Sequence, residues 1–287
     1  MIKRFNYIEK IKSFIDKPLI KVITGIRRSG KSTILALLRE ELFKKGIDKE
    51  RILFYNFESF ENFEFLTAIS LYEKIKGEIK KGRYYLLFDE IQEVKNWEKA
   101  INSFLVNFDV DIYITGSNSR LLSSELSTYL AGRYVEISIF TLSYNEFLSF
   151  RETYSLNEQD RKKSFESYLR MGGFPVIHTS DYTEETAYKV VYDIYSSVIL
   201  RDTIQRYKIR DIELLERVIK YAFDNIGNTF SGKNIADYFK SQKRKVDVKT
   251  VYNYLAAIEA AFICYGVPRY GIKGKEILKT QEKNYLC

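Results

Sequence analysis

The first half of the chain alternates short apolar runs with segments whose apolar residues recur at helical spacing. The apolar runs are rich in β-branched and aromatic residues and predict strands at residues 19–24, 51–57, 84–88, 110–115 and 134–139. Helical spacing marks residues 33–42, 63–80 and 97–108. Because strands that alternate with helices form parallel sheets covered on both faces, residues 1–150 are predicted to form an α/β domain.

The pattern changes after residue 150. Apolar residues keep helical spacing in residues 164–170, 184–206 and 211–225, and the Gly172-Gly173 pair followed by Pro175 interrupts them. No strand pattern stands out before residue 228, so residues 151–228 are predicted to form a helical subdomain.

The final segment, residues 229–287, combines helical and β-like patterns. Ser231 is a suitable N-cap for a helix over residues 233–239, and a polar basic turn at 240–245 leads into a second helix at 248–261. Two β-like runs follow at 262–267 and 277–285. Helix, basic turn, helix and hairpin in this order predict a winged helix-turn-helix.

Composition narrows the class of protein. In 287 residues, 45% hydrophobic and 15% aromatic content excludes a disordered chain. Two cysteines, Cys264 and Cys287, are too few for a disulfide framework or a four-cysteine zinc site. The charged N-terminus has no signal-peptide core, and no run approaches a membrane span. These features predict a cytoplasmic protein with no membrane partner.

A complete phosphate-loop pattern, GIRRSGKS, covers residues 25–32, directly after a predicted strand and at the start of a predicted helix. Glycines let successive backbone N–H groups point at phosphates, and the helix N-terminus adds positive charge. Lys31 is expected to reach the β- and γ-phosphates, and Ser32 to hold Mg²⁺. The residues expected to contact the nucleotide are Gly25, Arg28, Ser29, Gly30, Lys31, Ser32 and Thr33.

Two adjacent carboxylates, Asp89 and Glu90, follow the predicted strand LLF. A strand ending in aspartate places that carboxylate beside the phosphate loop, where it can bind Mg²⁺. Glu90 is then suited to polarise the attacking water, a role that favours hydrolysis over small-molecule phosphorylation. Without the phosphate loop, the same pair would indicate only a solvated turn.

Three further polar residues are candidates for sensing or stabilising the γ-phosphate. Ser117 and Asn118 follow the strand YIT and could orient water there, although a simple Gly-Ser-Asn turn is the alternative. Arg133 could stabilise transferred-phosphoryl charge, either in cis or from a neighbouring subunit. The second case requires a homo-oligomer.

Taken together, GIRRSGKST, LLFDEIQEV, YITGSNSRLL, LAGRYVEI, GGFP and VILRDTIQRY resemble prokaryotic, archaeal-type AAA-superfamily ATPases with a helical and winged-helix part of unknown function. The resemblance covers nearly the whole chain. It implies a P-loop domain of the AAA/ASCE type with ATP and Mg²⁺ as cofactors. It supports metal binding by Ser32 and Asp89, water activation by Glu90 and a γ-phosphate sensor at Ser117 or Asn118. It also supports stabilisation of transition-state charge by Arg133.

Such proteins usually continue into a C-terminal domain that resembles restriction endonucleases, whereas this sequence stops in the last predicted strand of the hairpin. We therefore expect a truncated or naturally shortened copy that lacks the nuclease-like domain.

Charge is concentrated in the predicted winged helix. Residues 231–287 carry eleven lysines and arginines and five acidic residues, a net of +6 out of +8 for the whole chain. The basic residues expected to meet DNA phosphates are Lys243, Arg244, Lys245 and Lys249. Three interpretations stay open: a switch ATPase coupled to a DNA-contacting winged helix, a signalling ATPase whose winged helix binds protein, and the motor half of an ATP-dependent nuclease.

Overall fold

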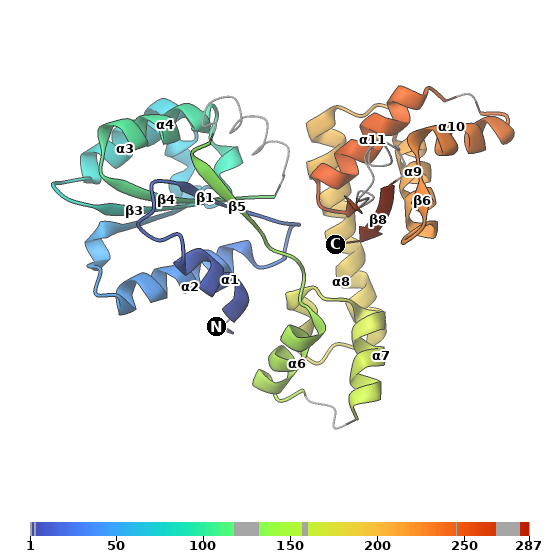
Figure 1. The fold of residues 1–287 in the computed structure, drawn as a ribbon, viewed down its shortest axis with the longest axis horizontal. Coiled ribbons are helices and arrows are strands. Elements are labelled where there is room, and N and C mark those ends of the chain that lie inside the picture. Colours follow the sequence, from blue (N-terminus) through green and yellow to red (C-terminus); the bar gives the residue numbers. More distant parts are fainter. Residues whose placement is uncertain are drawn as a thin grey trace, which may run out of the picture. The chain divides into compact units, whose positions relative to one another are not determined.

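The computed structural model describes residues 2, 4–117, 132–156, 160–244, 246–267 and 282–286. The chain packs as two compact units, Met1–Val191 and Tyr192–Cys287 (Figure 1). Within the described residues, no helix is both long and apolar enough to cross a membrane.

A five-stranded sheet forms the centre of the first unit. Its strand order is β2-β3-β4-β1-β5, and every neighbouring pair is parallel. The strands are β1 (Ile20–Thr24), β2 (Ile52–Asn56), β3 (Tyr84–Asp89), β4 (Val110–Gly116) and β5 (Tyr134–Ser138). The predicted parallel α/β sheet is therefore confirmed, and the carboxyl ends of β1, β3 and β4 meet at one edge.

Helices cover both faces of this sheet, as expected because β1, β3 and β4 are buried along nearly their whole length. On one face α1 (Phe5–Lys12) and α2 (Lys31–Lys44) pack over strand residues such as Ile23 and Leu87. On the other face α3 (Ala68–Glu78) and α4 (Trp97–Asn107) pack over Val22 and Phe88 (Figure 1). Three short 3-10 helices connect these elements: η1 (Lys49–Arg51), η2 (Phe60–Phe65) and η3 (Ile91–Glu93).

A helical region follows β5 in the same unit. It contains α6 (Tyr144–Thr153), α7 (Arg161–Met171), the 3-10 helix η4 (Pro175–His178) and the start of α8 (Glu184–Ser197). A Cβ atom on Gly173 would lie 2.4 Å from the carbonyl oxygen of Leu142, so the interruption between α7 and η4 needs glycine at the contact. His178 is fully buried there, and its Nε2 lies 2.7 Å from the carbonyl oxygen of Gly172.

The second unit pairs helices with a small antiparallel sheet of order β6-β8-β7. Its helices are the π-helix η5 (Val198–Gln205), α9 (Ile212–Asp224), α10 (Gly232–Ser241) and α11 (Val248–Ala260). Its strands are β6 (Thr229–Phe230), β7 (Cys264–Val267) and β8 (Glu282–Leu286). Ser231 caps α10 by accepting a hydrogen bond from the Asn234 N–H at 3.2 Å, as expected from its position. Residues 268–281, where the wing was expected, lie outside the described residues.

Candidate functional site

The phosphate-loop pattern forms the turn between β1 and α2, the position that the sequence predicted. Gly25 has φ +146°, and a Cβ atom there would lie 2.2 Å from the carbonyl oxygen of Ile139, so no other residue fits without moving the backbone. Gly30 has φ +101° and precedes α2 without any side-chain cap. The first N–H groups of α2 are therefore left for an anion to bind.

Lys31 is buried at the start of α2. Its ammonium donates hydrogen bonds to the carbonyl oxygens of Gly25 at 3.1 Å and Ile26 at 3.2 Å. The same Nζ lies 3.6 Å from Oε1 of Glu90. The loop thus surrounds the cation, and one carboxylate oxygen from the end of β3 approaches it.

Asp89, the last residue of β3, is 1% exposed. Its Oδ1 accepts a hydrogen bond from the Thr115 hydroxyl at 2.6 Å, while Oδ2 is buried with no hydrogen-bond partner among the described residues. Burial is the largest influence and raises the pKa of Asp89, against the opposing effects of the Thr115 and Ser32 hydroxyls. An oxygen that is buried and unpaired in this way is suited to a cation.

Glu90 adopts the left-handed conformation, with φ 53°, at the end of β3. This conformation is unfavourable for a non-glycine residue and needs local support. The Glu90 N–H donates to the Thr115 hydroxyl at 2.9 Å, and the Gln92 side-chain amide donates to Oε2 of Glu90. These contacts hold the carboxylate next to Lys31.

Thr115 is a functional residue that sequence reasoning missed. Its hydroxyl donates to Asp89 and accepts from the Glu90 backbone, so one side chain orders both carboxylate-bearing residues. The available signal was its position at the end of a buried strand, immediately before the Gly-Ser turn that drew attention instead.

The donor set fits a magnesium ion that is completed by nucleotide phosphates. Among the described residues, no group of three or more histidine, cysteine, aspartate or glutamate side chains could hold a metal alone. Mg²⁺ typically needs only one or two carboxylates when phosphates and waters supply its other ligands. Such a set is provided by the unpaired Oδ2 of Asp89 and the hydroxyl of Ser32, which is close enough to influence the pKa of Asp89.

The remaining loop residues differ in exposure. Arg28 is exposed with φ 62°, Ser29 is fully buried, and Thr33 is exposed in the first turn of α2. Ser117 is 1% exposed and follows β4, whose Gly116 pairs with Thr24 next to the loop. Asn118 lies outside the described residues.

Arg133 lies away from these residues. Its carbonyl oxygen accepts from the N–H of Ile20 at 2.8 Å, at the amino end of β1. The five residues of β1 separate that end from the phosphate loop by about 16 Å. The structure does not bring Arg133 to the loop of its own chain, so the cis arrangement that the sequence left open is not observed.

The basic residues of the second unit are partly engaged within it. Arg244 forms ion pairs with Asp211 at 3.3 Å and with Glu213 at 3.0 Å. Lys243 and Lys249 are exposed at the end of α10 and the start of α11. Lys245 lies outside the described residues.

Comparison with known proteins agrees with this fold. A family model described as an AAA domain matches residues 17–148, and a model described as a domain of unknown function matches residues 162–287. The structure is also similar to a Walker-type ATPase of Pyrococcus abyssi, with a TM-score of 0.67 and 14% identity over 99% of this chain and 93% of that one. The chain thus has an AAA domain with the P-loop ATPase fold.

Relatives in sequence extend over the whole chain. An uncharacterized protein of Haemophilus influenzae is 38% identical over 290 residues, which cover 100% of this chain and 71% of that protein. An uncharacterized protein of Methanocaldococcus jannaschii is 32% identical over 269 residues, 90% of this chain and 58% of that protein. The chain therefore belongs to this family of prokaryotic AAA ATPases with a C-terminal domain of unknown function, as its motifs indicated.

Proposed function

We propose that this chain binds ATP with Mg²⁺ and hydrolyses it, and that residues 229–287 in the second unit form a winged helix through which the ATPase acts on DNA. The observation that carries the enzymatic part is the assembly at one sheet edge of a phosphate loop, a buried lysine and two carboxylates. Lys31 follows the loop that leaves β1. Asp89 and Glu90 lie at the end of β3.

The residues divide the chemistry between them. The N–H groups of the loop and the Lys31 ammonium bind the β- and γ-phosphates. Ser32 and Asp89 hold the Mg²⁺, which when bound neutralises developing phosphate charge. Glu90 accepts a proton from the attacking water.

The proposal also gives roles to the predicted sensor residues and to Arg133. Ser117, with Asn118 after it, is proposed to contact the γ-phosphate because β4 ends next to the loop. Arg133 is proposed to act in trans within a homo-oligomer, since its own phosphate loop lies at the other end of the sheet.

Substitution of Lys31 tests nucleotide binding. Lys31→Ala removes the cation that meets the phosphates and should weaken ATP binding by roughly two orders of magnitude, measured by calorimetry. Lys44→Ala is the matched control, because Lys44 lies on the same helix, is exposed and pairs with Glu41 one turn away. Retained ATP affinity in Lys31→Ala would exclude the proposed phosphate site.

Substitution of Glu90 tests hydrolysis separately. Glu90→Gln keeps the shape and the Gln92 contact but removes the base, so ATP should bind normally while kcat falls about 10²–10⁴-fold. Glu93→Gln, on the exposed side of the same turn, is the control. If Glu90→Gln turns over ATP at the wild-type rate, Glu90 is not the base.

The DNA-contacting part rests on the second unit. Its element order of helix, strand, two helices and an antiparallel pair supports a winged helix, and the exposed Lys243 and Lys249 supply positive charge. Exposed apolar side chains on α10 and α11, Tyr238 and Val248, favour protein binding by the same surface as the second candidate.

A further inference from the structure

Arg4 is a buried arginine close to the start of the chain, outside every motif of the ATPase site. It is only 3% exposed, although it directly precedes α1. A buried guanidinium has to have its donors satisfied, because an unpaired buried charge is strongly destabilising. The hydrogen-bond partners of Arg4 therefore identify the parts of the chain that it connects.

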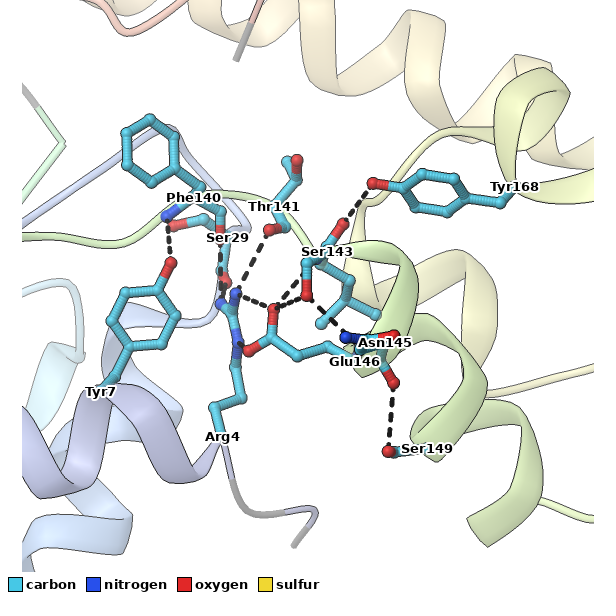
Figure 2. A network of polar contacts seen from close by, with 11 residues as sticks. Arg4, Tyr7, Ser29, Phe140, Thr141, Ser143, Asn145, Glu146, Ser149 and Tyr168 are labelled. Carbon is cyan, nitrogen blue, oxygen red and sulfur yellow. Dashed lines mark hydrogen bonds and ion pairs between the residues drawn. The ribbon is translucent and has the colours of Figure 1, made fainter. Parts of the chain in front are cut away.

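Every N–H of the Arg4 guanidinium donates a hydrogen bond (Figure 2). Nε and Nη2 bind the two carboxylate oxygens of Glu146 at 2.7 and 3.0 Å, a bidentate pair. Nη1 donates to the carbonyl oxygens of Ser29 at 3.0 Å and Phe140 at 2.9 Å. Nη2 also donates to the carbonyl oxygen of Thr141 at 3.2 Å. Only the planar five-donor fork of arginine can make this set.

One of these contacts lies inside the phosphate loop. The Ser29 carbonyl belongs to the same planar trans peptide as the N–H of Gly30, and the two groups point in opposite directions. Holding the Ser29 carbonyl towards Arg4 therefore turns the Gly30 N–H away from Arg4. Ser29 is fully buried, so in this structure Arg4 and not water satisfies its carbonyl.

The other contacts lie where β5 leads into α6. Phe140 and Thr141 form the connection, and the Phe140 N–H donates to the hydroxyl of Tyr7 at 3.2 Å. The Arg4 guanidinium also stacks over the Tyr7 ring, with 4.5 Å to its centroid. Arg4 and Tyr7, both near the start of the chain, thus hold this connection by hydrogen bonds.

Glu146 links this cluster to a helix end. It is the partner of Ser143 in the capping box of α6 and accepts from the Ser143 N–H at 2.9 Å. The same Oε2 atom accepts from Nη2 of Arg4 at 3.0 Å. Burial opposes ionisation, but the hydrogen bonds from Arg4 and Ser143 lower the pKa of Glu146 overall. A displacement of Arg4 would therefore change the hydrogen bonds of Glu146 in the first turn of α6.

We propose that Arg4 is a positioning residue that orients the Ser29–Gly30 peptide of the phosphate loop and couples nucleotide binding there to the first turn of α6. The coupling rests on the ATPase function proposed above. It gives the loop a direct connection to the helical region that follows β5, through side-chain contacts within the first unit.

Arg4→Lys tests this coupling in the full chain, because lysine keeps the charge but cannot serve the carboxylate and three carbonyls together. We expect KM for ATP to rise about tenfold, the effect of losing roughly one charge-assisted hydrogen bond at the loop. We also expect hydrogen exchange of the α6 amides, slowed in the wild type by a non-hydrolysable ATP analogue, to become insensitive to the analogue. A purely structural role would lower the melting temperature without removing this nucleotide-dependent protection.

Two further variants keep the outcome interpretable. Glu146→Gln retains a capping oxygen but breaks the bidentate pair, so it should reproduce the loss of α6 protection even if Arg4→Lys folds poorly. Arg170→Lys is the control, because Arg170 pairs with Glu184 on an exposed surface and should leave KM unchanged. Wild-type KM and α6 protection in both Arg4→Lys and Glu146→Gln would overturn the coupling alone. Absence of ATP binding by the wild-type chain would overturn the proposed function instead, and the coupling with it.

Discussion

At the scale of single residues, the site depends on how Asp89 is buried. Its carboxylate is 1% exposed and has one hydrogen-bonded and one unpaired oxygen. A buried carboxylate without a full set of partners costs free energy when it is ionised. In the proposed ATPase the same oxygen would hold the metal ion, and that contact would offset the cost.

Asp89→Asn should therefore stabilise the nucleotide-free chain at neutral pH. Because the folded-state pKa of Asp89 is raised, ionisation opposes folding above that pKa, and its cost disappears as the pH falls through it. The amide removes the charge and should raise the free energy of unfolding by about 1 kcal/mol near pH 7. Urea unfolding at pH 7 and at about pH 4, where the two proteins should converge, measures the effect.

Addition of ATP and Mg²⁺ should reverse the order. The wild type gains stability from the bound nucleotide and metal, whereas Asp89→Asn lacks a metal ligand and gains less. A variant that is less stable than the wild type at neutral pH without nucleotide would show that Asp89 is not under strain from burial.

Residue-level chemistry was predictable where it follows a local pattern. The phosphate loop and the Asp89-Glu90 pair are contiguous motifs at the end of strands, so sequence spacing was enough to place them at one edge. Thr115 and Arg4 act through contacts 26 and 142 residues away in sequence, and no local pattern indicates such partners.

At the scale of elements, β1 and β4 are joined by a buried ion pair as well as by their parallel ladder. Lys21 and Asp111 are fully buried and hydrogen-bonded to each other, and the Tyr113 hydroxyl and the Asp16 N–H each donate to Asp111 at 2.8 Å. Burial lowers the pKa of Lys21, despite the opposing effect of Asp111. The pair lies at the amino half of the two strands, away from the phosphate loop.

Lys21→Met should strongly destabilise the first unit because it leaves the Asp111 carboxylate buried without its cation. We expect the free energy of unfolding to fall by about 3–5 kcal/mol. Denaturant titration measures this loss. In the double variant Lys21→Met with Asp111→Asn much of this stability should return, since no isolated charge is left. If the double variant is as unstable as Lys21→Met, the loss arises from packing and not from the unpaired charge.

Strands and helices of the first unit were predictable because burial imposes their period. The expected strand at residues 84–88 is β3 (Tyr84–Asp89), and the expected helix at 97–108 is α4 (Trp97–Asn107). The expected helix over 184–206 is present, but its second half is the π-helix η5. The π-helix has i→i+5 hydrogen bonds but covers only 8 residues, too short a run for hydrophobic spacing to distinguish it from an α-helix.

At the scale of the whole molecule, charge is distributed unevenly between the parts of the chain. The net charge of residues 231–287 is +6 of a total of +8. Part of this positive charge is already paired, because Arg244 forms ion pairs with Asp211 and Glu213 within the second unit. Lys243 and Lys249 are exposed at the turn between α10 and α11.

Lys243→Glu combined with Lys249→Glu should therefore weaken DNA binding, whereas Arg244→Gln should affect it less, because Arg244 is already neutralised by acidic partners. Counterion release makes phosphate contacts visible as the slope of log K against log salt, and removing two contacts should lower that slope by about 2. Fluorescence anisotropy with duplex DNA at several salt concentrations measures it. Lys80→Glu with Lys81→Glu, both in the first unit, is the charge-matched control.

The same measurement separates the first two of the three interpretations that the sequence left open. A DNA-acting ATPase has to show a steep salt dependence that falls in the Lys243 and Lys249 variant and stays in the control. A surface that binds protein through Tyr238 and Val248 predicts only weak DNA binding, equally weak in the Lys243 and Lys249 variant and in the control. Since the proposed ATP hydrolysis depends on Glu90 in the first unit, loss of DNA binding with unchanged basal turnover would assign the two proposed activities to separate parts of one chain.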